Sequence, residues 1–429
     1  MTVAILVGVF VVLMLLGMPI AFAIGIASTF AAINVYVVDN VTIVQRMLTG
    51  INSFPLLAVI FFVFTGVVMA KGGVAIRLVR LAEVLVGRLP GGLAHINVVA
   101  SMLFGGVSGS AVADVSSIGR IMIRAMENDG YTRRFAVAIS LASATMGPII
   151  PPSISMILYA YLAGNVSVAG LLLAGFIPGL LIGGGLLVAA FVHGKLYHDT
   201  HTPRLTGREK LLRIADGCAG LFTLVIILVG ITSGVFTATE AGAVAAVYAL
   251  FLTTVIYREV KVADLPALLW EGCLTNAVVM FLIATTSVFT FLLTYENVPA
   301  WIATHFLSVT DSKVLILLVI NVLLLLIGLF IDLTPALVMM VPILLPLAEK
   351  LDIHPIHLGV IMVVNLTFGL ITPPVGTSLF VGCRIAGISM TELVKPMIPL
   401  LIIMVAALML VTYFPDLFMW LPAMFGFVT

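Results

Sequence analysis

The sequence predicts an all-α polytopic membrane protein built from two inverted-topology repeats, and its composition, its charge distribution and an internal repeat support this. Of its 429 residues, 62% are hydrophobic and 9% are charged. Such a chain has too little polar surface to cover a water-soluble globule. Its apolar runs are far longer than the alternating segments of about ten residues in a membrane barrel. The net charge of +1 provides no basic surface, so nucleic acid is not expected as a partner.

Several segments are long enough to cross a bilayer. A spanning helix needs about 20 mostly apolar residues, and the ranges 221–235, 241–257 and 315–331 reach or approach this length. Residues 1–19 have no Lys or Arg before their apolar stretch. We therefore expect this segment to remain as a helix rather than to be cleaved as a signal peptide.

The basic residues predict how the chain lies in the membrane. They concentrate in three stretches, residues 71–88, 120–134 and 193–216. The positive-inside rule places all three in the cytoplasm. The loops at 296–311 and 349–357 are poorer in positive charge, so we expect them on the other side, together with the N-terminus. Residues 193–216 are interpreted as a cytoplasmic linker that ends a first half, residues 1–216, and precedes a second half, residues 217–429.

The two halves share a sequence pattern. The string Thr-x-Gly-x-x-x-Pro-Pro occurs at 145–152 and again at 367–374, an offset of 222 residues. Basic residues precede the first copy and a charge-poor loop precedes the second, so the copies are expected to enter the membrane from opposite faces. This is the arrangement of inverted repeats.

Each half also contains a hairpin and an interrupted helix. Apolar segments broken by Gly or polar residues predict re-entrant hairpins at about 96–126 and 313–348. Interrupted helices are predicted at 135–163 and 357–384, and a further helix ends the second half. Unwound backbone at membrane depth is tolerated only where it is buried or lines a cavity. We therefore expect the four breaks to meet at one site.

Four motifs in fixed order resemble a known family. They are GGVSGSAVAD at 105–114, GPIIPPS at 147–153, GVFTATEAGAVAAVYAL at 234–250 and ITPPVGTSLF at 371–380. Over essentially its whole length, the chain resembles the large membrane subunit (DctM-like) of tripartite ATP-independent periplasmic (TRAP) transporters.

The resemblance implies a function and partners. It implies sodium-driven uptake of a small organic anion, such as a C4-dicarboxylate, sialic acid or another sugar acid, across the bacterial inner membrane. The fold implied is an ion-transporter-type elevator fold, in which a transport domain moves across the bilayer. The implied partners are a small membrane subunit (DctQ-like) and a periplasmic substrate-binding protein, besides membrane lipid. Since the repeat begins almost at Met1, the small subunit is expected as a separate chain. The resemblance also implies Na⁺ as the coupling ion and no organic cofactor, and the N-terminus is expected to be periplasmic.

Two acidic residues lie beside the hairpin tips. Asp114 and Asp332 would each be costly at membrane depth unless something offsets the charge, and a bound cation would do so. The alternative is that each caps the second helix of its hairpin.

The breaks are rich in the oxygen donors that a hard cation such as sodium prefers. A hydroxyl in an apolar helix can instead bond to the carbonyl one turn earlier, and for any single residue this alternative stays open. The predicted sodium site comprises Ser108, Ser110, Asp114, Ser143, Thr145, Gly147, Gly328, Asp332, Asn365, Thr367, Gly369 and Thr372.

The substrate is predicted to meet helix N-termini, whose partial positive charge suits an anion. Helices are expected to begin after each Pro-Pro pair. Arg384 could pair with a carboxylate, although the positive-inside rule favours its interpretation as a cytoplasmic-end arginine. The predicted substrate-binding residues are Ser110, Ser153, Ser155, Thr377, Ser378 and Arg384.

Two other functions were weighed. The string Gly106-Val107-Ser108-Gly109 is the GxSG pattern of intramembrane serine proteases, which would need a histidine base near Ser108. No histidine is expected there, so no enzymatic activity is predicted. The nearer alternative is a stand-alone sodium/dicarboxylate symporter that needs no binding protein.

Overall fold

The computed structural model describes residues 2–35, 38–197, 206–309, 312–373 and 376–428. These residues form helices and connecting loops, with no strand among them, which confirms the all-α prediction. Seven of the described helices are long and apolar enough to cross a membrane. They are Phe54–Lys71, Val168–Leu196, Gly207–Thr232, Ala238–Ile256, Val262–Tyr295, Leu333–Lys350 and Met390–Tyr413.

The helices of the first half are α1 (Thr2–Leu15), α2 (Ile20–Asn34), α3 (Asn40–Ile51), α4 (Phe54–Lys71), α5 (Val74–Val86), α6 (Gly92–Ser108), α7 (Ala111–Asp114), α8 (Arg120–Asn128), α9 (Arg133–Ala144), α10 (Ile154–Ala163) and α11 (Val168–Tyr197). Those of the second half are α12 (Gly207–Thr232), α13 (Ala238–Phe251), α14 (Leu265–Tyr295), α15 (Val298–Val309), α16 (Lys313–Gly328), α17 (Leu333–Lys350), α18 (Pro355–Gly369), α19 (Thr377–Ala386), α20 (Met390–Tyr413) and α21 (Asp416–Met424).

The two halves present their helices in the same order. In each half, two helices come first (α1 and α2; α12 and α13), followed by a long segment (α3 with α4; α14) and a short helix (α5; α15). A helical hairpin (α6 to α8; α16 and α17), a broken helix (α9 and α10; α18 and α19) and a long helix (α11; α20) complete each half. Equivalent helices also make equivalent contacts. Between the halves, α4 packs on α13 as α14 packs on α2, and within each half α6 packs on α9 as α16 packs on α18.

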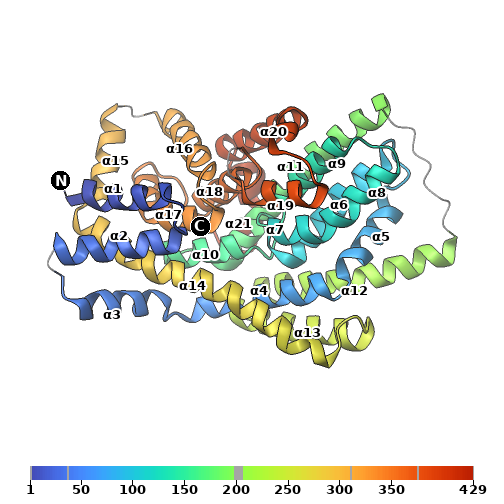
Figure 1. The fold of residues 1–429 in the computed structure, drawn as a ribbon, viewed down its shortest axis with the longest axis horizontal. Helices are drawn as coiled ribbons and strands as arrows, with labels where there is room; N and C mark the ends of the chain where they lie inside the picture. The colour runs from blue at the N-terminus through green and yellow to red at the C-terminus, as the bar shows by residue number, and fades with distance from the viewer. Residues whose placement is uncertain (1, 36–37, 198–205, 310–311, 374–375, 429) are drawn as a thin grey trace.

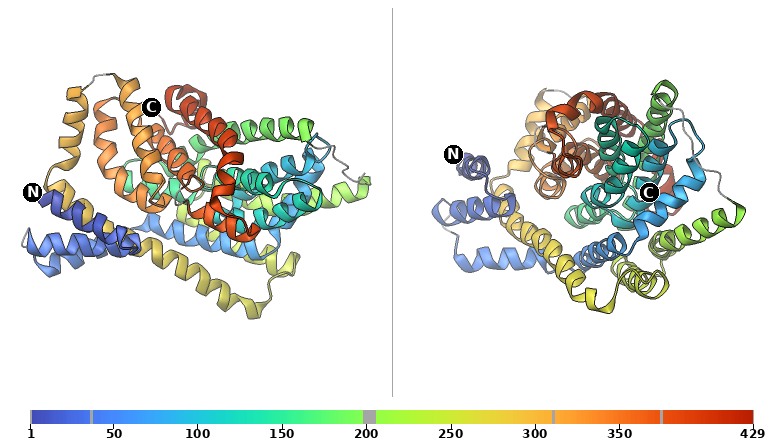
Figure 2. Two further views of the ribbon diagram at one scale, coloured as in Figure 1. Left: turned by 45° about the horizontal axis from the view of Figure 1, so that its top comes forward. Right: turned by 45° about the vertical axis from the view of Figure 1, so that its right-hand side comes forward.

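The hairpins lie at opposite ends of the molecule. Figure 1 shows α6 to α8 toward the end that carries α5 and α12, and α16 with α17 toward the end that carries α15. The tips of both hairpins reach the middle, where α7 packs on α19 and α17 packs on α10. In Figure 2, α2, α4, α13 and α14 form a layer along one side of the hairpins. This layer is called the outer helix layer below.

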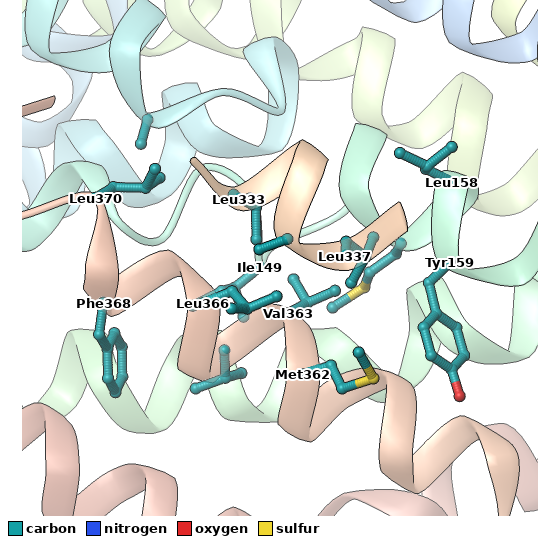
Figure 3. Close-up of a cluster of buried hydrophobic side chains, with 14 of the residues drawn as sticks. Ile149, Leu158, Tyr159, Leu333, Leu337, Met362, Val363, Leu366, Phe368 and Leu370 are labelled. Carbon is teal, nitrogen blue, oxygen red and sulfur yellow. The ribbon is translucent and has the colours of Figure 1, made fainter. Parts of the chain in front are cut away.

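Buried apolar side chains hold the second hairpin against both broken helices. Figure 3 shows Leu333 and Leu337 of α17 beside Ile149 from the first break and Val363 and Leu366 of α18. All five are buried, four of them completely. Such a core buries apolar area between elements far apart in sequence and so fixes where the hairpin tip lies.

The predicted linker at 193–216 is shorter than expected. Helix α11 continues to Tyr197 and α12 already begins at Gly207, where Thr206 and Glu209 form a capping box. Of the described charged residues in this stretch, Lys195 lies in α11 and Arg208, Lys210 and Arg213 lie in α12. Residues 198–205 lie outside the described residues, as do Pro374 and Val375 in the second break.

Candidate substrate and sodium site

The first hairpin turns at three small residues. Helix α6 ends at Ser108, Gly109 has a left-handed φ of 63°, and Ser110 accepts a hydrogen bond from the Ala113 amide at 3.4 Å as the N-cap of α7. A Cβ at Gly109 would lie 2.6 Å from the Pro152 carbonyl oxygen. The tip therefore rests directly on the first helix break, and only glycine permits this approach.

Asp114 is buried behind this tip. Its side chain is fully buried, and the Ser101 hydroxyl donates to Oδ1 at 2.9 Å. Its Oδ2 atom has no hydrogen-bond partner among the described residues. The alternative that Asp114 caps the helix is wrong, because Ser110 provides the cap one turn earlier. A π-helical turn, Val115–Gly119, follows, and such turns are frequent at functional sites.

Asp332 occupies the corresponding tip of the second hairpin. It stands at the N-cap position of α17, but its side chain makes no capping hydrogen bond. Instead, Thr377 at the start of α19 donates to Oδ1 of Asp332 at 3.0 Å. Asp332 therefore occupies the N-cap position that the alternative gave it, but its side chain does not make the capping hydrogen bond. Ser110 and Asp332 are related by the 222-residue offset and take equivalent positions at the two tips.

Glycines allow each tip to touch its helix break. A Cβ on Gly369 would lie 2.3 Å from the Gly328 carbonyl oxygen. In the first half, a Cβ on Gly147 would lie 3.0 Å from the Ser110 carbonyl carbon, and one on Gly105 would lie 3.0 Å from the Gly147 Cα. Backbone therefore packs on backbone at both junctions, which brings carbonyl groups of the two elements close together.

Four of the six hydroxyls predicted as sodium ligands donate to a backbone carbonyl three or four residues earlier in the chain. Thr145 donates to the Ala142 carbonyl and Thr367 to the Val363 carbonyl, both at 2.6 Å. Ser143 and Thr372 make similar bonds, to Ser140 and Phe368. These are the back-bonds that the sequence left as an alternative. They direct the hydrogen toward the backbone and leave lone pairs on the oxygen that can face a cation.

A cavity of about 590 Å³ lies between the two hairpin tips. Three predicted residues line it: Ser110, Ser155 and Asp332. The opposite wall comes from the outer helix layer, including Thr275 and Val278 of α14. Most of the lining is apolar with a few polar groups at the tips, which is typical of a small-molecule site.

The other predicted substrate residues lie outside this lining. Ser153 is fully buried as the N-cap of α10 and donates to the Pro148 carbonyl. Thr377 reaches the cavity only through its bond to Asp332. Ser378 is fully buried, and its hydroxyl has no hydrogen-bond partner in the described part of the chain. Arg384 is exposed in the last turn of α19, away from the lining.

A second cavity of about 840 Å³ adjoins the first on the side of the basic residues. Ser108 and Ser110 line it, together with Lys71, Arg120 and Glu271. Lys71 forms an ion pair with Glu271. The two cavities share Ser110 and four further lining residues, Val63, Val112, Ile154 and Thr275. The space between the tips is thus continuous with the end of the molecule that is rich in Lys and Arg.

The sequence reasoning missed several polar residues. Ser101 bonds to Asp114, and the Asn97 amide donates to Ser140 at 2.6 Å. In the second half, Asn365 donates to Oδ1 of Asn321 at 2.8 Å. In each half, then, a buried polar pair joins the first hairpin helix to the broken helix. A polar residue within an otherwise apolar helix was the signal available for each.

Comparison with known proteins decides the family. The family model for the tripartite ATP-independent periplasmic transporter, DctM component, matches residues 7–417. The chain belongs to this family. It is therefore a DctM component, a multi-pass transport permease and not an enzyme, and the serine-protease interpretation of Ser108 is set aside.

Relatives of this DctM component extend over its whole length. It is 43% identical to the uncharacterized protein YgiK of Salmonella typhimurium over 98% of this chain and 97% of that protein. It is 38% identical to the sialic acid TRAP transporter large permease protein SiaM of Vibrio cholerae, over 96% of each chain. The C4-dicarboxylate TRAP transporter large permease protein DctM of Rhodobacter capsulatus is 33% identical, over 99% of this chain and 100% of that one.

A solved structure shares the fold. The Alcanivorax borkumensis YdaH transporter superposes with a TM-score of 0.64 over 89% of this chain and 88% of its own, at 16% sequence identity. At this identity the likeness concerns the fold alone.

Proposed function

We propose that this DctM component takes up a small organic anion, driven by sodium, through the cavity between its two hairpin tips. The observation that carries the proposal is the pairing of polar groups from equivalent positions of the two halves, Ser110 and Asp332, in one cavity. A site shared by two repeats at the middle of a membrane protein is the usual place for substrate in secondary transporters.

Sodium binding is supported by Asp114. A buried carboxylate with an oxygen left without a hydrogen bond is costly, and a cation beside it would offset that cost. The hydroxyls of Ser143 and Thr145, the close backbone at Gly147 and the equivalent groups Asn365, Thr367 and Gly369 supply further oxygens near the tips. Sodium bound there would help to hold the tips on the breaks.

The substrate class is supported by the cavity and by the relatives. The names of the relatives specify sialic acid and C4-dicarboxylates, both small anions. A volume of about 590 Å³ accommodates either, and the tip hydroxyls can donate hydrogen bonds to a carboxylate.

The proposed working cycle is an elevator motion in the inner membrane. The hairpins and broken helices would move as one body against the outer helix layer, with the N-terminus in the periplasm. The continuity of the cavity with the Lys- and Arg-rich end supports an inward-facing arrangement here. A periplasmic binding protein would deliver the substrate, and a DctQ-like small subunit in a separate chain would brace the outer layer.

Uptake by proteoliposomes tests the sodium proposal. With the three components present, we expect accumulation of labelled sialic acid or succinate only under an inward sodium gradient, because the tips offer oxygen donors suited to a hard cation. Initial rates in sodium, potassium and choline buffers measure this. Full accumulation under a proton gradient in sodium-free buffer would contradict it. If uptake persists without the binding protein, the chain is the stand-alone symporter.

A further inference from the structure

A third cavity, of about 490 Å³, lies between the outer helix layer and the moving elements, at the end away from the basic stretches. It is lined by residues of α3, α10, α14 and α17. Figure 1 shows α3, α17 and the C-terminal half of α14 on the side of α15, opposite to α5, α8 and α12. In the orientation proposed above, this is the periplasmic side.

Arg46 provides the charge of this cavity. Its guanidinium carbon lies 4.3 Å from the centre of the Phe291 ring. None of the ion pairs in the described part of the chain includes Arg46, and the lining contains neither Asp nor Glu. Arg46 is exposed, so its guanidinium is accessible to a ligand that enters the cavity. Its planar fork of donors matches a carboxylate.

Hydroxyl groups line the same cavity as this arginine. Thr49, Thr286, Ser287, Thr290 and Thr294 line the cavity, four of them on α14. Thr286 is buried, and its hydroxyl has no hydrogen-bond partner among the described residues. An unpartnered buried hydroxyl is itself costly, so it points to a polar ligand in the cavity.

Helix α14 lines both the Arg46 cavity and the proposed substrate site. Residues 274–282 of α14 face the cavity between the tips, and residues 283–294 face the Arg46 cavity. At 1.5 Å per residue, the centres of these two stretches are about 16 Å apart along the helix. Tyr161 of α10 donates to the Gly50 carbonyl of α3 at 2.7 Å beside the Arg46 cavity, so a moving element closes against it in this structure.

We propose that Arg46 and the surrounding hydroxyls form a second anion site, which takes the carboxylate of the organic anion on the periplasmic side before it reaches the hairpin tips. This rests on the proposed function for the identity of the anion. The ligand class is a small carboxylate that also carries hydroxyl or carbonyl groups. The headgroup of an anionic lipid shares the charge but not the small size.

Thiol labelling tests this site without requiring transport. Cys218, Cys273 and Cys383 are replaced by serine, and Thr290→Cys introduces one thiol into the cavity. The protein is placed in phosphatidylcholine vesicles, and the reaction rates of an anionic and a cationic methanethiosulfonate reagent are compared. We expect Arg46→Gln to lower the anionic-to-cationic ratio about 25-fold, because losing one charge at about 4 Å in water slows the anionic reagent and speeds the cationic reagent by about fivefold each. If the protein with Thr290→Cys does not fold, Thr294→Cys introduces the single thiol instead.

Two variants and two ligands complete the design. Arg46→Lys should keep the ratio, and Arg208→Gln, which removes an exposed charge near the start of α12, should leave it unchanged. Succinate or N-acetylneuraminate should slow labelling only when Arg46 is present. An unchanged ratio in Arg46→Gln, or slowing by phosphatidylglycerol but by neither acid, would overturn the proposal.

A transport assay tests the role of Arg46 independently of thiol labelling. In the sodium-driven uptake assay, Arg46→Gln should raise KM about tenfold and change kcat less than twofold, because the residue acts on first binding and not on the movement. An unchanged KM would overturn the role of Arg46. If the unmodified protein shows no sodium-driven uptake, the proposed function fails, while the labelling still reports whether Arg46 binds anions.

Discussion

Asp114→Ala should raise the sodium concentration needed for half-maximal uptake by roughly a hundredfold or more. The carboxylate is fully buried, accepts one hydrogen bond from Ser101 and has a second oxygen without a partner. If sodium completes this site, removing the charge leaves a buried cation without its counter-ion, at a cost of about 3–5 kcal/mol. Each 1.4 kcal/mol is about a factor of ten in affinity. Initial uptake rates over a range of sodium concentrations measure the change.

Ser101→Ala is the matched control for Asp114. It removes only the hydroxyl that donates to Oδ1, and a single hydrogen bond to a charged group contributes about 1.5–3 kcal/mol. Its effect on sodium dependence should therefore be smaller than that of Asp114→Ala.

Asp332→Ala should weaken the binding of both sodium and substrate, because Asp332 also lines the cavity. If Asp114→Ala and Asp332→Ala insert normally and keep the unmodified sodium dependence, both carboxylates are structural only.

Gly369→Ala should abolish most transport and lower the thermal stability. The added Cβ would lie 2.3 Å from the Gly328 carbonyl oxygen and 2.6 Å from its Cα, so the second tip would have to leave the break. Overpacking of this kind costs about 1–3 kcal/mol. We expect the uptake rate to fall at least about tenfold, because a displaced tip also separates Asp332 from Thr377, at the start of α19.

Gly184→Ala is the control for this change. Gly184 lies in α11, where a new Cβ would meet nothing within 4 Å. The same substitution should leave uptake unchanged and slightly raise the melting temperature, since alanine favours a helix over glycine by about 1 kcal/mol. Melting curves and uptake rates of the two variants, measured side by side, distinguish the loss of close packing at Gly369 from the general effect of replacing a glycine by alanine. Normal uptake by Gly369→Ala would show that the close approach is not needed.

The sequence was informative wherever a residue type limits the backbone. The Pro-Pro pairs cannot continue a helix and the glycines near them weaken one, and α9 and α18 end at these strings. The small residues at 108–110 likewise mark the first tip. These features are local, so they could be predicted without knowing how the chain packs. The relation of the halves as inverted repeats and their motion stay predictions.

Features that depend on tertiary packing could not be predicted in this way. Ser110 and Asp114 are both residue types that cap helices, and only the register of the short helix α7 decides that Ser110 is the cap. The wall formed by Thr275 and Val278 comes from an apolar helix with no distinctive chemistry. Arg46 lies outside the basic stretches, and its cavity exists only because α3, α10, α14 and α17 meet.

Equilibrium binding of radioactive sodium to the purified protein tests the central claim most directly, because it needs neither partner and no gradient. The account predicts saturable sodium binding that tightens when sialic acid or succinate is added, since the tips that meet the substrate also hold the ion. The same binding should be lost in Asp114→Ala. Binding that is absent from the unmodified protein, or that is equal in the variant, would contradict a sodium site at the hairpin tips.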